Sequence, residues 1–179
     1  MKTGRATITL VLMCCWVATA GAQLRRREPL TPLEIDQLRD AAMDPAARLK
    51  LFVHFARARL AVVEQVRNDA KATDRGQQTH DRLQEFVDIY DELNENIDNF
   101  IERKEDLRKP LKAVIEADNE FQAKLLALKG APDAGPKEAD QYRFLVDNAL
   151  ETVATGVQDH KQLLAAQDEA AKHRGKGKS

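Results

Sequence analysis

The sequence predicts an all-α protein, folded as an elongated antiparallel three-helix bundle of coiled-coil type with a short extra helix at its N-terminal end. Of the 179 residues, 43% are hydrophobic and 32% are charged, whereas only 5% are aromatic. Residues that favour helices, such as Ala, Leu, Glu, Lys, Arg and Gln, dominate the chain. Apolar residues recur at heptad spacing over a long stretch, and Pro and Gly mark the breaks between the expected helices.

Residues 1–22 have the pattern of a secretory signal peptide. Lys2 and Arg5 form a basic start, an uncharged and mostly apolar run follows, and Ala20-Gly21-Ala22 offers a cleavage site after Ala22. Both cysteines of the chain lie inside this segment, so the mature protein would have no disulfide. We therefore expect a secreted or periplasmic protein that is held together by packing alone.

An uncleaved signal anchor in the membrane is the alternative. The uncharged stretch from Ala6 to Leu24 spans 19 residues, which is close to the length that crosses a bilayer as a helix. Three arginines, Arg25 to Arg27, follow directly, and positive charge at that point resists export. Residues 23–30 are expected to form a basic linker before the folded part of the chain.

Two Pro-containing caps predict the starts of the first two helices. Thr31-Pro32-Leu33-Glu34 combines an N-cap threonine, a proline at the first helical position and a capping-box glutamate, and this helix is expected to reach about Met43. Asp44 and Pro45 repeat the arrangement for a second helix, expected to reach about Ala72. Its apolar residues cover more than one face, so it should have partners on at least two sides.

The region from Thr79 to Lys129 is the most regular part of the sequence and is expected to form one long helix. An unbroken series of apolar residues recurs every seven positions: Phe86, Leu93, Phe100, Leu107, Val114, Phe121 and Leu128. A second series fills the alternate core position, which completes the heptads of coiled-coil packing. Because the heptad phase is kept on both sides of Pro110, we interpret this proline as a kink and not as a chain reversal.

The last helix is expected from about Pro136 to Lys172, after a loop rich in Pro and Gly. Short loops make sequence neighbours antiparallel, so the three long helices should form one bundle over residues 31–172. Residues 173–179 contain Gly-Lys-Gly-Lys and are expected to form a disordered basic tail.

The distribution of charge supports this pairing of neighbours. Pro45–Lys71 carries six basic and two acidic residues, and Asp81–Asp106 carries three and ten. Residues 107–129 carry five and three, and residues 136–171 carry three and seven. Each expected hairpin therefore pairs segments of opposite charge. This pattern selects which helices pair with each other more than it stabilises the fold.

No motif of the expected mature chain is typical of catalysis. It lacks a cysteine nucleophile, a phosphate-binding loop, a Gly-x-Ser-x-Gly elbow and the His-Glu-x-x-His zinc motif, and no histidine has Glu three residues before it. We therefore expect neither an enzyme nor a cofactor. The sequence favours an exported helical-bundle protein that acts by binding another protein or itself, as a scaffold, adaptor or chaperone-like protein.

The alternative function is a bundle of the cell envelope that binds a small ligand or a metal. His54 or His160 would act with nearby carboxylates, although a lone histidine near an apolar helix face, as at His160, is more often structural. The acidic run from Asp88 to Glu102 could also bind a hard cation. A solvated face opposite the basic second helix explains the same run equally well.

Two further candidate interaction residues are charged residues at heptad core positions. Lys104 and Asp118 interrupt the second apolar series, where a polar group can fix helix register or contact a partner. The simpler interpretation is that Lys104 extends past the Pro110 kink to solvent, and that Asp118 meets solvent or a polar group.

The last candidates are Lys176 and Lys178 in the basic tail. Together with Arg25–Arg27 they could contact an anionic membrane surface, which otherwise requires an uncleaved signal segment. A chain with an acidic body and basic ends is a poor nucleic-acid binder along its length, so we expect no nucleic-acid partner.

Overall fold

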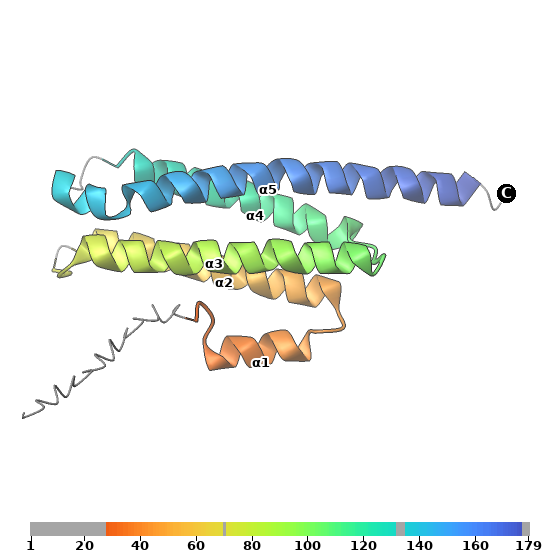
Figure 1. The fold of residues 1–179 in the computed structure, drawn as a ribbon, viewed down its shortest axis with the longest axis horizontal. Helices are drawn as coiled ribbons and strands as arrows, with labels where there is room; N and C mark the ends of the chain where they lie inside the picture. The colour runs from red at the N-terminus through yellow and green to blue at the C-terminus, as the bar shows by residue number, and fades with distance from the viewer. Residues whose placement is uncertain (1–27, 70, 132–134, 177–179) are drawn as a thin grey trace, which may run out of the picture.

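The protein is described by a computed structural model that covers residues 28–69, 71–131 and 135–176. All regular structure in these ranges is helical, which confirms the all-α class (Figure 1). The five helices are α1 (Pro32–Asp40), α2 (Pro45–Asn68), α3 (Arg75–Glu102), α4 (Arg108–Lys129) and α5 (Pro136–Lys176).

The four long helices α2 to α5 form a bundle, and α1 packs on α2 (Figure 1). α2 and α5 each contact both α3 and α4, whereas α3 and α4 lie diagonally opposite each other. α3 and α5 run in the same direction and form one layer, which faces the reader in Figure 1; α2 and α4 form the layer behind it. Sequence neighbours are antiparallel, as expected.

The single helix expected from Thr79 to Lys129 is wrong, and the bundle therefore has four long helices in place of three. α3 ends at Glu102, and the chain reverses over residues 103–107 before α4 begins (Figure 1). The end of α3 is a Schellman motif, in which the N–H of Lys104 donates to Ile101 O (2.8 Å) and the N–H of Glu105 donates to Phe100 O (3.0 Å). Lys104 has the left-handed conformation that this motif requires, with φ of 62°.

Pro110 marks the start of a helix and does not kink one. It is the third residue of α4, where backbone N–H groups have no acceptor within the helix, so a proline there removes no hydrogen bond. Lys104 does not occupy a core position but is exposed in the turn. The heptad phase survives because Phe100 and Leu107 enter the same core from opposite sides of the turn, and both are buried.

The other helix starts lie near the expected positions. Thr31 caps α1 in a capping box, with the N–H of Glu34 donating to Thr31 Oγ1 (3.3 Å) and the N–H of Thr31 donating to Glu34 Oε2 (2.7 Å). Asp44 Oδ1 accepts from the N–H of the third residue of α2 at 3.1 Å.

The helix boundaries differ from the expected ones by a few residues. α1 ends three residues earlier than expected, α2 ends four residues earlier, and α3 begins four residues earlier. α5 continues through His173 to Lys176, so the expected basic tail begins inside the helix.

The heptad residues form the core, as expected. All seven members of the series from Phe86 to Leu128 are buried. In the middle of the bundle, the ring centroids of Phe86 and Phe121 lie 5.3 Å apart, and that of Tyr90 lies 6.0 Å from Phe86. α2 is apolar on more than one face because α1, α3 and α4 all pack against it.

Charge is separated between the two layers of the bundle. α2 and α4 together carry ten Lys and Arg against four Asp and Glu, a net charge of +6. α3 and α5 carry eight against fifteen, a net charge of −7. Ion pairs join the layers, for example Arg59 with Glu85 and Lys129 with Asp147. The oppositely charged segments that the sequence pairs within each hairpin are thus neighbours in the structure. Helices of like charge, in contrast, share a layer.

Arg59 of α2 holds the N-terminal segment against the bundle. Its guanidinium donates to both carboxylate oxygens of Glu34 (2.8 and 2.7 Å) and to the carbonyl of Pro29 (2.7 Å). Arg59 Nε also lies 3.2 Å from Glu85 Oε2, as an ion pair without hydrogen-bond geometry. Burial alone would raise the pKa of Glu34, but the hydrogen bonds from Arg59 and from the backbone of Thr31 outweigh it and lower this pKa.

The expected signal peptide, its cleavage after Ala22 and the alternative anchor all fall on residues 1–27, outside the described residues. Among the helices that the structure describes, none combines the length and the apolar character needed to cross a bilayer.

We expect Lys104→Gly to raise the free energy of unfolding by about 1 kcal/mol, because the left-handed conformation costs a residue with a Cβ atom about 1–2 kcal/mol. Glycine avoids this cost but loses some of the gain through its greater freedom in the unfolded chain. Urea unfolding of the protein measures the change. Lys112→Gly, inside α4, is the control and should lower stability by about 1 kcal/mol. A similar loss for Lys104→Gly would indicate a continuous helix in place of the turn.

We expect Glu34→Gln to loosen α1 in a pH-dependent way. Since the pKa of Glu34 is lowered from 4.5 in the folded protein, its carboxylate stabilises α1 above that pH, and the contribution is lost as the pH falls through the lower folded value. The variant should lose about 1–3 kcal/mol of protection in α1 at pH 7, and the difference from wild type should shrink below pH 4.5. Hydrogen exchange of α1 amides measures this. Asp36→Asn, in an exposed pair on the same helix, should change little at either pH.

Candidate functional site

A polar cluster lies buried in the middle of the bundle and joins three helices. The hydroxyl of Tyr90 on α3 donates to Asp118 Oδ1 on α4 at 2.9 Å. His160 Nδ1 on α5 lies 2.8 Å from the other carboxylate oxygen, Asp118 Oδ2. Tyr90 and Asp118 are 0% exposed and His160 is 4% exposed. Asp118 therefore meets polar groups of the protein and no solvent.

Each member of this cluster stands at a core position of its helix. Asp118 continues the heptad series of Leu111 and Leu125, both of which are fully buried. A carboxylate at such a position is costly unless hydrogen bonds satisfy both of its oxygens. The side chains of two other helices supply these bonds, so sliding any one helix by a turn would break at least one of them. This geometry supports the interpretation of Asp118 as a residue that fixes helix register.

Gly156 of α5 provides the space for the Tyr90 side chain. A Cβ atom added at Gly156 would lie 2.2 Å from the Tyr90 hydroxyl oxygen and 3.1 Å from Cζ. Such an atom would collide with a ring that is itself held by Asp118. The glycine stands one turn before His160, so the close approach and the polar cluster belong to the same part of the α3/α5 contact.

The protonation of the cluster follows from its surroundings. Burial, followed by the neighbouring Asp118 carboxylate, raises the pKa of Tyr90, so its phenol stays protonated and serves as a donor. An ionised carboxylate only accepts hydrogen bonds, so His160 Nδ1 is the donor in its contact with Asp118. Nε2 makes no hydrogen bond to any residue that the structure describes.

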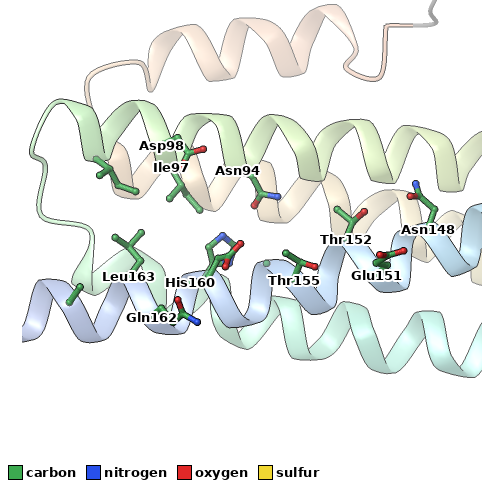
Figure 2. Close-up of a pocket in the computed structure, with 14 residues that line it drawn as sticks. Asn94, Ile97, Asp98, Asn148, Glu151, Thr152, Thr155, His160, Gln162 and Leu163 are labelled. Carbon is green, nitrogen blue, oxygen red and sulfur yellow. The ribbon is translucent and has the colours of Figure 1, made fainter.

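His160 also forms part of the wall of an open groove between α3 and α5, which we call the acidic groove. Its volume is about 740 Å³. Figure 2 shows Asn94 and Ile97 pointing from α3 toward α5, and His160 and Leu163 pointing from α5 toward α3. Carboxylates from both helices line the groove: Asp98, Glu151 and Asp159.

A second groove, which we call the alanine groove, runs between α2 and α4 on the opposite layer. Its volume is about 790 Å³. Small and apolar residues form most of its lining, among them Ala46, Ala47, Pro110, Ala113 and Ala117. Basic side chains, Lys50, His54 and Lys109, stand beside them. At one end, the Arg57 guanidinium pairs with Glu120, with Nη2 and Oε2 2.8 Å apart.

The structure brings together two of the five candidate interaction residues, Asp118 and His160. Lys104 lies apart from them in the α3–α4 turn, Lys176 is the last residue of α5, and Lys178 lies outside the described residues. His54 lines the alanine groove on the other layer, away from His160.

The acidic run from Asp88 to Glu102 does not gather into a metal site. Within the described part of the chain, no group of three or more His, Cys, Asp or Glu side chains converges closely enough to hold a metal ion. Asp98, a member of this run, lines the acidic groove.

Tyr90 is the member of the cluster that does not stand out as a candidate in the sequence, because it occupies an ordinary heptad core position. On one continuous helix the two residues would be 28 positions apart, roughly 42 Å. The chain reversal at residues 103–107 removes this separation, since it places α3 and α4 across the core from each other.

Comparisons of the chain with models of protein families, with curated proteins and with solved structures found no match.

We expect Gly156→Ala to lower the free energy of unfolding by about 1–3 kcal/mol, because the new Cβ atom would collide with the Tyr90 hydroxyl. Tyr90→Phe alone should also cost about 1–3 kcal/mol, since it leaves Asp118 Oδ1 without its donor. The double variant lacks the oxygen that the methyl group meets, so its loss should be smaller than the sum by about 1 kcal/mol.

Chemical unfolding of the four proteins in a double-mutant cycle measures this coupling. Gly130→Ala is the control, because an added Cβ there meets no atom closer than 3.4 Å, and we expect a change within about 0.5 kcal/mol. Strict additivity of Gly156→Ala and Tyr90→Phe would contradict the packing of Tyr90 against Gly156.

Proposed function

We propose that this chain is an exported, non-enzymatic protein that acts as an adaptor or chaperone-like protein by binding an acidic amphipathic helix of a partner in the alanine groove. The observation that carries the proposal is the groove itself, a long apolar channel on the basic layer of the bundle. Export is supported by the signal-peptide pattern of residues 1–22, and the lack of catalytic motifs in the sequence supports a non-enzymatic role.

The dimensions and lining of the alanine groove fit a helix. Its α2 side extends from Ala46 to Arg57, twelve residues that span roughly 16 Å, which matches three turns of a partner helix. The two flanking helices run in the same direction, behind α3 and α5 in Figure 1. Alanines on both sides leave space between α2 and α4 that the apolar side chains of a third helix would fill.

The charge around the groove determines the chemistry of the partner. Lys50 and Lys109 form no ion pair with the described residues, and Glu116 is the unpaired carboxylate beside them. Both lysines belong to a layer with a net charge of +6. A helix that carries Asp or Glu beside its apolar stripe would be complementary to this surface, and long-range attraction would speed its approach.

A second candidate function is the binding of a small ligand through His160 and nearby carboxylates. The observation that favours it is the acidic groove, which brings His160 next to carboxylates of two helices. This groove lies on the opposite layer, so the two functions do not exclude each other.

The test uses the mature chain, residues 23–179, and a fluorescent synthetic peptide with Leu at helical spacing and Glu elsewhere. We expect the double variant Lys50→Glu, Lys109→Glu to bind this peptide at least about tenfold more weakly, because two favourable charges become repulsive. Ala113→Phe should also weaken binding, since the larger ring occupies the channel. Fluorescence polarisation measures both effects.

Lys112→Glu is the matched control, because Lys112 is exposed on α4 and does not line the groove. Equal losses for the control and the groove variants would overturn the proposal. Sedimentation equilibrium of the chain alone tests another occupant: a dimer that Lys50→Glu, Lys109→Glu dissociates would show that a second copy fills the groove in place of a partner helix.

A further inference from the structure

We infer that the alanine groove binds its partner helix antiparallel to α2 and α4, and that this helix carries its acidic residues in its C-terminal turns. The inference rests on the proposed function, because it adds a direction and an order of charges to the helix proposed there. It is drawn from the sequence of charges along the groove and from the common direction of the two flanking helices.

One ion pair aligns the two walls of the groove along their length. Arg57 of α2 and Glu120 of α4 face each other, with Nη2 and Oε2 2.8 Å apart. Because α2 and α4 run in the same direction, residues that precede this pair by equal numbers stand level with each other (Figure 1). Lys50 stands roughly 10 Å before Arg57, and Lys109 stands roughly 16 Å before Glu120. Both lysines therefore lie toward the end of the groove where the two helices begin.

The unpaired charges that line the groove change sign along this direction. Lys50 and Lys109, near the end where α2 and α4 begin, form no ion pair with the described residues. Glu116 lies farther along and is likewise unpaired within the described part of the chain. The last Lys or Arg of the lining is Arg57, and Glu120 neutralises it. The groove is thus positive where the flanking helices begin and negative or neutral farther along.

The backbone dipole of a helix matches this order of charges in one direction only. It places partial positive charge at the N-terminus of the helix and partial negative charge at the C-terminus. A helix antiparallel to α2 and α4 puts its C-terminal turn at Lys50 and Lys109, and an earlier turn beside Glu116. The dipoles of α2 and α4 act in the same sense, because their positive ends lie beside the C-terminal end of the partner. A parallel helix would reverse each of these contacts.

This direction also defines where the partner carries its acidic side chains. Asp and Glu in its C-terminal turns meet the unpaired lysines of the groove. In a free helix such residues repel the negative end of the dipole, and the lysines offset this repulsion in the complex. Carboxylates in the first turn, which are favourable in a free helix, would lie in the part of the groove that holds Glu116. The groove therefore selects against helices with the common order of charges.

Two ion pairs mark where the bound part of the partner helix starts. Arg57 with Glu120 is the first, and Glu64 with Lys124 is the second, and both cross from α2 to α4. Beyond the first pair, only a smaller hollow of about 160 Å³ lies between the two helices in this part of the chain. The crossing side chains stand where a third helix would continue. The partner helix thus starts beside Arg57 and covers about three turns toward the lysines.

Two synthetic peptides of equal composition test the direction. Both have Leu at helical spacing and chemically blocked ends. One carries Glu in its last turns and Gln in its first turns, and the other has the reverse order. Fluorescence polarisation with the protein measures both affinities. We expect the peptide with C-terminal Glu to bind at least about threefold more tightly, although it forms the weaker helix on its own.

Variants of the protein separate the effect of the groove from the helix content of the peptides. In Lys50→Gln, Lys109→Gln the ratio of the two affinities should fall to about one or invert, because only helix content then distinguishes the peptides. Lys112→Gln, Lys161→Gln is the matched control: it changes net charge equally, at exposed positions that do not line the groove, and should keep the wild-type ratio. All four lysines are exposed, so neither pair should prevent folding.

A spin label on the peptide with C-terminal Glu reports the direction independently of affinity. A label at its C-terminal end should broaden the amide NMR signals of Lys50 and Lys109 more than that of Glu120. A label at its N-terminal end should do the reverse. The two ends of the groove are roughly 16 Å apart, so the two patterns are readily distinguished.

Tighter binding of the peptide with N-terminal Glu to the wild-type protein would overturn the inference. A C-terminal label that broadens Glu120 more than Lys109 would do so too, and either result would leave the proposed function in place. Equal affinities, with each label affecting both ends of the groove, would show a groove without a preferred direction. Failure of both peptides to bind would instead contradict the proposed function itself, so the two failures are distinguishable.

Discussion

A carboxylate in the centre of an apolar bundle needs a hydrogen-bond donor for each of its oxygens, and Asp118 obtains them from two other helices. Tyr90 and His160 can reach it only when α3, α4 and α5 have the register that the structure shows. The same requirement explains Gly156, since the tyrosine ring needs the space that a side chain would fill. It also explains why His160 faces the acidic groove with a fixed orientation.

The sequence predicts most of the local structure but not the number of long helices. Caps at Thr31 and Asp44 and the apolar heptads are physical signals that act within a few residues, and they are found in the structure. The reversal at residues 103–107 lacks such signals: Lys104 takes the place where glycine is usual, and Leu107 caps α4 without a side-chain hydrogen bond. Heptad spacing defines which side chains share a core but does not define the direction of the chain.

The candidate site was predictable as separate residues and not as a cluster. Asp118 and His160 stand out because polar side chains are rare at core positions. Their contact depends on the pairing of α4 with α5, and the contact with Tyr90 depends on a reversal that the heptads conceal. Likewise, opposite charges on adjacent segments predict which helices pair, whereas only the diagonal placement of α3 and α4 gathers like charges into one layer.

This layering makes the protein an electric dipole across its thickness. The whole chain has a formal net charge of −1, yet its two faces differ by thirteen elementary charges, from +6 to −7. Such a protein rotates in the electric field of a charged partner before the two molecules make contact. It therefore meets the partner with the face of opposite charge. The bundle is thus nearly neutral and yet strongly oriented by electric fields. Its behaviour toward charged surfaces follows from its dipole moment and not from its total charge.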